Sequence, residues 1–207
     1  MTTQLTIRQY APLKPETFDD RTRSVRIVAA TENPIIKRDP VLGVRINIVH
    51  FVDGFIIPPS GQVPLLDSHD RSSVSNVLGS VRNFEVKNRV LECDVFFSGT
   101  SAAKDAAQKV KEGHLTDFSV GYYYLLSDSH LIPPGKTKEI RGRTFKGPVR
   151  VITKCYLREV SIAPIGADRY AKVKISDKSK TKFQPDTSDI ILFVFVVYLL
   201  FFLLIRI

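Results

Sequence analysis

The spacing of apolar residues predicts that short strands make up most of the chain. Leu91, Cys93, Val95 and Phe97 alternate with polar residues, which is the period-2 pattern of a strand with one buried face. Segments of similar composition, separated by turn residues, recur along the chain. We predict strands within residues 24–30, 41–52, 79–98, 115–126 and 149–165, the 79–98 segment forming two strands joined by a turn near residues 87–88.

The apolar period changes between residues 100 and 114, where it predicts a helix. Ala103, Ala106, Ala107 and Val110 follow the i, i+3, i+4, i+7 spacing of one helix face, and Gly113 is placed to end the helix. Short antiparallel strands with one clear helix are typical of a mainly β fold, either a barrel or a sandwich with helical decoration.

The pattern at residues 149–165 predicts one long strand that carries a carboxylate on its apolar face. Alternate positions from Val149 to Leu157 are mostly apolar, and the positions between them include Arg150 and Arg158. Continuing the alternation places Glu159 on the apolar face, where an unpaired carboxylate is costly. We therefore expect Glu159 to have a polar partner.

The composition is that of a folded globular domain, with 43% hydrophobic and 25% charged residues in 207. The net charge of +9 would suit nucleic acid or an anionic surface as a partner. The basic residues are spread along the chain, however, and the one cluster, at residues 171–183, is typical of a solvated linker. Cys93 and Cys155 are expected to be buried free thiols in a reducing compartment. No N-terminal signal peptide is visible, so we expect a cytoplasmic origin.

The hydrophobic run at residues 190–205 differs from the rest of the chain. A helix of its 16 apolar residues would span about 24 Å, less than the ~30 Å hydrocarbon core of a bilayer. We favour an altered reading frame or a truncation that replaced the native end. A membrane anchor, supported by the lysines before the run, is the second interpretation. A buried hairpin or core segment is the third, although the run contains no turn residue.

Several familiar motifs are incomplete in this sequence. The segment PPGKTKE does not complete the phosphate-binding loop pattern, because His130 stands where that pattern needs its first glycine. The segment DFSVG is not a nucleophile elbow because Asp117 replaces the first glycine. The cysteines and the four histidines have no metal-ligand spacing, so we expect no metal site.

Three residues distant in sequence have the chemistry of a serine hydrolase. A serine needs a base to remove its proton, and the base needs an acceptor that fixes its tautomer. Ser119, His69 and Glu159 supply one residue of each type. Their spacing does not show that they meet. His69 as a polar turn residue, Ser119 as a small strand residue and Glu159 paired with a neighbouring cation are the alternatives.

Three blocks of the sequence, at residues 62–81, 106–124 and 141–168, resemble the prohead proteases of tailed phages of the HK97 type. They contain the histidine of an L-x-x-H block, the serine of an [FLM]-S-[FVI]-G-[FY] block, and a late REVS block. The resemblance extends from about residue 23 to 174. It implies that His69 is the base, Ser119 the nucleophile and Glu159 the third member of a Ser-His-Glu triad.

That family in turn is similar to the herpesvirus assemblins, and this resemblance implies a closed antiparallel β-barrel wrapped by helices. Glu159 takes the place of the third assemblin histidine, and Gly166 the place of a glycine that precedes the oxyanion hole. The implied oxyanion candidates are the backbone of Ala167 and the side chain of Arg169. We also expect Gly121, on the same strand face as Ser119, to leave room for a substrate backbone.

The resemblance implies a serine endopeptidase that needs no cofactor and has no specific nucleic-acid partner. It would act inside the procapsid in the host cytoplasm, cutting the scaffolding segment from the capsid protein and also cutting itself. An idle capsid or scaffolding component with the same fold, and a membrane-tethered prophage remnant, are the alternatives. We divide the chain into an irregular N-terminal arm, a protease domain, a basic and polar linker, and a hydrophobic tail, at residues 1–22, 23–174, 175–189 and 190–207.

Overall fold

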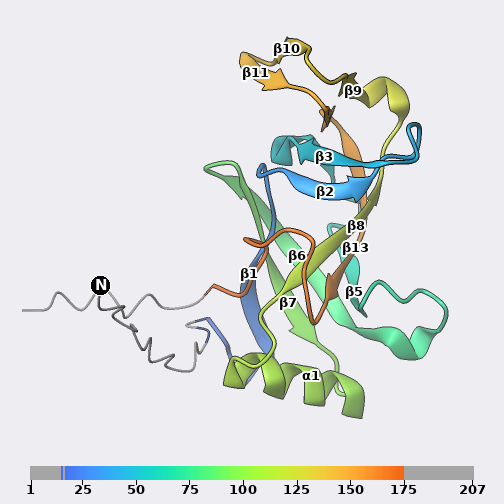
Figure 1. Ribbon diagram of the computed structural model, residues 1–207. Coiled ribbons are helices and arrows are strands. Elements are labelled where there is room, and N and C mark those ends of the chain that lie inside the picture. The colour runs from blue at the N-terminus through green and yellow to red at the C-terminus, as the bar shows by residue number, and fades with distance from the viewer. Residues whose placement is uncertain (1–14, 16, 175–207) are drawn as a thin grey trace, which may run out of the picture. The chain divides into compact units, whose positions relative to one another are not determined.

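The computed structural model describes residue 15 and residues 17–174, and the fold of this part is mainly β (Figure 1). The strands, in chain order, are β1 Ser24–Thr31, β2 Ile35–Arg38, β3 Arg45–His50, β4 Phe55–Ile56, β5 Val63–Asp67, β6 Val77–Lys87, β7 Val90–Phe97, β8 Phe118–Tyr123, β9 Ser129–Ile132, β10 Thr137–Ile140, β11 Arg143–Lys146, β12 Val149–Ile152 and β13 Cys155–Ile162. The helices are α1 Ser101–Glu112 and the short 3-10 turns Val52–Gly54, Val74–Asn76 and Leu126–Asp128.

Three of the four segments into which we divided the sequence lie wholly or mostly outside the residues that the structure describes. They are the N-terminal arm, the linker at residues 175–189 and the hydrophobic tail at residues 190–207. Within the described part of the chain, no helix has both the length and the apolar character needed to cross a membrane.

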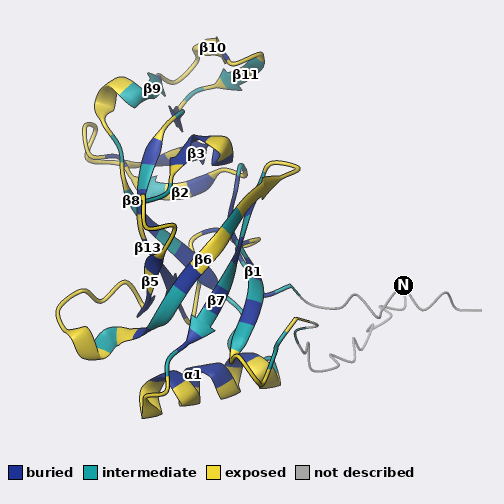
Figure 2. Ribbon diagram, turned by 180° about the vertical axis from the view of Figure 1, so that it is seen from behind, coloured by how far each residue is buried: buried dark blue, intermediate teal, exposed yellow. Residues whose placement is uncertain are grey.

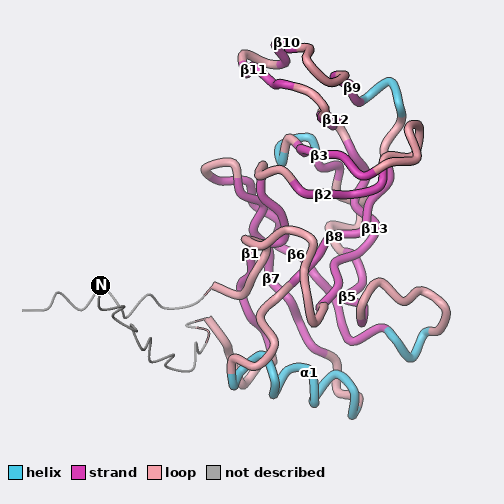
Figure 3. The backbone as a smooth tube through the Cα atoms, viewed as in Figure 1, coloured by secondary structure: helices cyan, strands magenta, loops and turns pink. Residues whose placement is uncertain are grey.

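The largest sheet has seven strands, in the order β1-β7-β6-β5-β13-β4, with β8 also paired to β13. It is antiparallel from β1 to β5, and β13 then runs parallel to both β5 and β4 and antiparallel to β8. Figure 3 shows how strongly this sheet curls. The second sheet has the order β2-β3-β12-β9, and β10 and β11 form a separate hairpin.

The expected closed barrel is wrong, because the large sheet is a curled half-barrel. Its strands β1 and β8 do not pair with each other. A short segment, residues 171–174, lies between them: the Val28 amide donates to the Lys172 carbonyl at 2.9 Å, and the Phe118 amide donates to the Ala171 carbonyl at 2.9 Å. These contacts are isolated bridges, so they tie the two edges together without forming a continuous ladder.

Helix α1 follows the prediction from apolar spacing. The Thr100 hydroxyl accepts from the Ala103 amide and caps its start, and Gly113 ends it with the left-handed φ of 81° that glycine adopts easily. Its alanine face and Val110 are buried in the main hydrophobic core. Figure 2 shows the corresponding division of the helix into a buried and an exposed side.

The predicted strand pair at residues 79–98 is also confirmed, as β6 and β7. The turn between them contains Asn88 and Arg89, both with positive φ, and the first ladder pair is Lys87 with Val90. The single strand expected at 149–165 is wrong: it is divided into β12 and β13, which belong to different sheets. Both cysteines are buried free thiols, as expected.

Candidate active site

Two adjacent strands, β8 and β13, carry Ser119, Gly121 and Glu159. In their antiparallel register, Ser119 lies opposite Ser161, and Gly121 lies opposite Glu159. Directly opposed residues point to the same face of a sheet. These four residues therefore share one face, while Phe118 on the other face is fully buried in the core.

A β-bulge at Arg158 places Glu159 on this face. Leu157 pairs with Tyr122 and Glu159 pairs with Gly121, so β13 advances two residues where β8 advances one. An extra residue reverses the alternation of side chains beyond it. The expectation that Glu159 shares the apolar face of Leu157 is therefore wrong, because simple alternation takes no account of a bulge.

His69 reaches the same place from the turn that follows β5. Strand β5 runs parallel to β13, with Leu66 paired to Ser161, so its C-terminal end lies beside the Ser119–Ser161 pair. The turn residues Ser68 and His69 have φ of 47° and 64°. Non-glycine residues rarely adopt this left-handed region, at a cost of about 1–3 kcal/mol each. Such strain is found most often at functional sites.

Hydrogen bonds join His69, Glu159 and Ser161 into one network. His69 Nδ1 lies 2.7 Å from Glu159 Oε1, and the Ser161 hydroxyl donates to Glu159 Oε2 at 2.7 Å. The His69 amide donates to Ser161 Oγ at 3.0 Å. Arg71 adds a longer contact, from Nη2 to Oε1 at 3.4 Å, so the buried carboxylate has the polar partners that its burial requires.

This network sets the ionisation of Glu159 and the tautomer of His69. Burial raises the pKa of Glu159, but the hydrogen bonds from His69 and Ser161 outweigh it and hold that pKa below its ordinary value. An ionised carboxylate only accepts hydrogen bonds, so the proton in the contact belongs to His69 Nδ1. In the neutral imidazole, His69 Nε2 then carries the lone pair that a general base needs.

Asp67, two residues before the histidine, is another carboxylate that could orient the imidazole, but it has a different contact. Its carboxylate accepts from the Ser68 hydroxyl at 2.8 Å. In the part of the chain that the structure describes, Asp67 makes no hydrogen bond to the imidazole. The geometry therefore favours Glu159 over Asp67 as the orienting group.

Gly121 makes room for the Glu159 carboxylate, and the expectation that it also leaves room for a substrate backbone stays a prediction. A Cβ atom built on Gly121 would lie 1.6 Å from Glu159 Oε1 and 2.7 Å from Arg71 Nη2. Both distances are far below a van der Waals contact. Any larger residue at position 121 would therefore displace the carboxylate that holds His69.

Ser119, His69 and both oxyanion candidates, Ala167 and Arg169, line one cavity of about 780 Å³. Ser119 is only 5% exposed, so its hydroxyl is reached from this cavity and not from an open surface. Among the described residues, Ser119 has no hydrogen bond to His69. The structure thus joins His69 directly to Glu159, and brings Ser119 to the same cavity wall.

The segment that carries Ala167 and Arg169 is anchored by two carboxylates. Asp117 accepts from the Gly166 amide at 3.0 Å, and Asp168 accepts from both the amide and the hydroxyl of Thr31 at 2.8 Å. The Gly166 amide is thereby occupied. The Ala167 amide has no acceptor among the described residues, which leaves it available to a ligand in the cavity.

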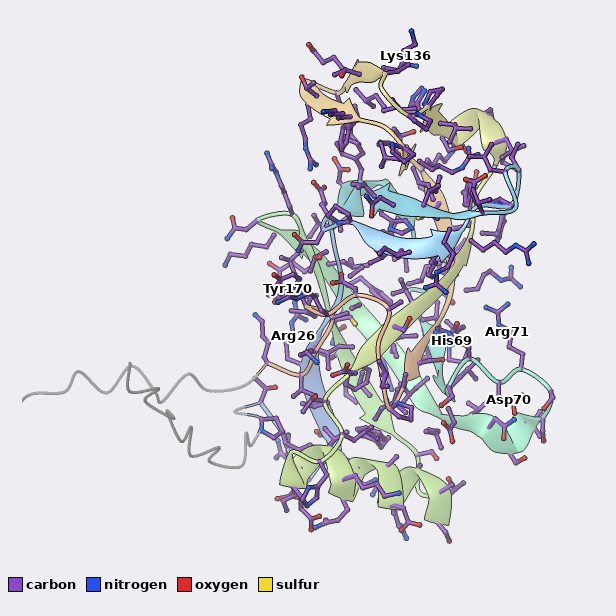
Figure 4. The ribbon with its side chains drawn as sticks, viewed as in Figure 1. Arg26, His69, Asp70, Arg71, Lys136 and Tyr170 are labelled. Carbon is purple, nitrogen blue, oxygen red and sulfur yellow. The ribbon has the colours of Figure 1, made fainter. Side chains whose placement is uncertain are left out.

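Sequence reasoning missed three residues of this site, namely Ser161, Arg71 and Asp117. Ser161 lies in the REVS block, two residues from Glu159, so strand periodicity could have found it. Asp117 was noted only because it interrupts a motif. Figure 4 shows His69 and Arg71 on the same side of the described fold, with Arg26 and Tyr170 on the opposite side.

Comparison with known proteins identifies a family. A family model described as caudovirus prohead serine protease matches residues 58–185, a range that contains His69, Ser119 and Glu159. No curated protein and no solved structure matches the chain. The similarity to herpesvirus assemblins that the sequence implied accordingly stays a prediction.

Proposed function

Because the chain belongs to the caudovirus prohead serine protease family, we propose that it cleaves the scaffolding segment from a phage capsid protein inside the procapsid. The family indicates serine peptidase activity in capsid maturation. We further propose that the protease also cleaves itself, that it acts in the host cytoplasm, and that residues 23–174 form the catalytic domain.

One observation carries the assignment of roles. The imidazole of His69 is held at 2.7 Å by the buried carboxylate of Glu159, in the wall of the cavity that also contains Ser119. A serine nucleophile, a histidine base and a carboxylate that orients the base are the three groups that peptide hydrolysis by a serine enzyme requires. We therefore assign the nucleophile to Ser119, the base to His69 and the orienting role to Glu159.

The proposed reaction begins when His69 Nε2 removes the proton of Ser119 Oγ, which attacks the carbonyl carbon of the scissile bond. The oxyanion of the tetrahedral intermediate accepts a hydrogen bond from the Ala167 amide, with Arg169 as the second candidate donor. His69 then gives its proton to the leaving amine, and an acyl-enzyme remains. Water, deprotonated by His69, releases the second product and restores Ser119.

Glu159 acts through His69 in this scheme. It stabilises the imidazolium that forms in each step and keeps Nε2 directed at the cavity. Ser119 and His69 share no hydrogen bond among the described residues. This is compatible with His69 acting as the base for Ser119, since nucleophile–base contacts are often long without substrate and tighten in the complex.

Two measurements test the proposal. A fluorophosphonate probe should label the wild-type protein but not Ser119→Ala, since the probe reacts with an activated serine. Co-expression with the capsid protein of the same phage should yield a shortened capsid protein by mass spectrometry, and Ser119→Ala should leave it at full length. Full-length capsid protein together with an unlabelled wild-type enzyme would instead support the idle capsid or scaffolding component.

A further inference from the structure

In the part of the chain that the structure describes, the cavity around Ser119 and His69 is lined by cations and by no acidic residue. Lys37, Arg45 and Arg169 contribute to its wall, together with His69. Among the described residues, none of these three cations forms an ion pair with a carboxylate. Clefts lined by charges of one sign attract ligands of the opposite sign. The cavity is therefore suited to an anionic group.

Lys37 is the cation that lines both cavities of the site. It lines both the Ser119 cavity and an adjoining cavity of about 520 Å³ that His69, Arg71 and Gly121 also line. Its ammonium lies 5.3 Å from the centroid of the Tyr122 ring. Lys37 thus lies on the wall that the two cavities share, as does His69.

The charge of Lys37 is only partly compensated in this position. Burial lowers the pKa of Lys37, and attraction to Glu159 offsets part of this effect. The Glu159 carboxylate is already occupied by His69 and Ser161. A partly buried ammonium with no carboxylate of its own gains most from a ligand that supplies one.

The strand pair β2–β3 adds a second, independent sign of an anionic ligand. Arg38 lies directly opposite Arg45 in this ladder. Like charges in opposed positions destabilise a sheet, and a bound anion would relieve the repulsion. Arg45 lines the Ser119 cavity and Arg38 lines the adjoining one. Among the described residues β2 pairs only with β3, so Arg38 lies on an edge of this sheet.

We propose that the protease selects substrates with an acidic side chain within two residues of the scissile bond, and that Lys37 recognises this side chain. The inference rests on the proposed function, because it concerns the same cavity. A glutamate or aspartate would pair with the Lys37 ammonium while its backbone lies at Ser119, and a lysine or arginine at the same position would be repelled.

A library of proteome-derived peptides, analysed by mass spectrometry, reports the residues on both sides of every cut. Asp and Glu should be enriched at one position within two residues of the cut. For the best peptide, changing that acid to its amide should lower kcat/KM by about tenfold or more, the scale of a charge-assisted hydrogen bond.

Three variants of Lys37 test the recognition itself. Lys37→Gln should lose most of the discrimination between acid and amide, Lys37→Glu should favour a lysine there, and Lys37→Arg should keep the preference for an acid. The matched control is Lys104→Glu, which makes the same charge change at an exposed position on α1. It should retain the wild-type preference, which separates local recognition from an effect of net charge.

The outcomes separate this inference from the proposed function. An enzyme that reacts with the fluorophosphonate at Ser119 but cuts peptides without acidic preference, or cuts none of them, overturns the inference and leaves the function standing. An acidic preference that survives in Lys37→Glu also overturns it. Failure of the fluorophosphonate to label the wild-type enzyme overturns the function, and the inference with it.

Discussion

Replacement of Gly121 by alanine gives the sharpest test of how the site is built. The new Cβ would lie 1.6 Å from Glu159 Oε1 and 2.4 Å from its carboxylate carbon. The carboxylate must therefore move by at least about 1 Å, and a displacement of that size in an active site costs on the order of a hundredfold in rate. We expect Gly121→Ala to fold and to process substrate about a hundredfold more slowly.

The effect on stability should be smaller, because two contributions oppose each other. A hydrogen bond to a charged group is worth about 1.5–3 kcal/mol, and the shift of the carboxylate weakens those from His69 Nδ1 and Ser161. Replacing glycine within a strand recovers roughly 0.5–1 kcal/mol of backbone entropy. We therefore expect the free energy of unfolding to fall by about 1–2 kcal/mol.

Three quantities are measured for the variant and the wild type: the rate of fluorophosphonate labelling, the rate of capsid-protein cleavage and the thermal unfolding midpoint. Gly99→Ala is the matched control, since a Cβ at Gly99 would have no atom within 4 Å. It should behave like the wild type in all three measurements. If Gly121→Ala cleaves the capsid protein within about twofold of the wild-type rate, the Glu159 carboxylate is not required in its place, and the argument from this glycine fails.

Three further predictions concern the roles of the site and the extent of the domain. Ser119→Ala and His69→Ala should each lower capsid cleavage by several orders of magnitude while the protein stays folded by circular dichroism; near-wild-type cleavage by either variant would exclude the mechanism. Glu159→Gln should reduce cleavage clearly but leave a measurable rate, because this group orients the base and does not react. Since the folded-state pKa of Glu159 is lowered, its contribution to stability should be complete above the unfolded-state pKa of about 4.3 and should be lost as the pH falls further. The decrease of the thermal unfolding midpoint at acid pH should therefore be smaller in Glu159→Gln than in the wild type. An equal decrease in both proteins would argue against the buried ionised carboxylate. Deletion of residues 184–207 should leave the enzyme folded and active and improve its solubility, as measured by circular dichroism, fluorophosphonate labelling and the soluble fraction; an unfolded product would show that the domain extends beyond residue 183.

Local sequence was sufficient wherever local interactions decide the structure. The alanine face of α1, its Thr100 cap and its Gly113 terminus all lie within one short segment, so their spacing alone predicted the helix. The β6–β7 hairpin was predictable for the same reason, since its turn and its alternating strands are adjacent in the chain. The blocks around His69, Ser119 and Glu159 likewise sufficed to identify the family.

The sequence failed where pairing between distant segments decides the structure. Strand β2 has only four residues, and it is formed by its ladder with β3 more than by its own composition. The half-barrel stays open because residues 171–174 lie between β1 and β8, which no local pattern records. Apolar spacing therefore predicted a mainly β fold correctly, and the closed barrel that the resemblance implied is wrong.

For the site, residue chemistry selected three candidates, and tertiary structure decided how they could be arranged. The order of β5, β13 and β8 in the sheet brings the end of β5 beside the Ser119–Ser161 pair. The bulge at Arg158 then turns Glu159 to that face, and Gly121 supplies the space that its carboxylate fills. The one-residue shift at the bulge and the absence of a Cβ at Gly121 have an effect only because β13 and β8, about 40 residues apart in sequence, are paired in the sheet. This is why alternation along a single strand selected Glu159 as a candidate but assigned it to the wrong face.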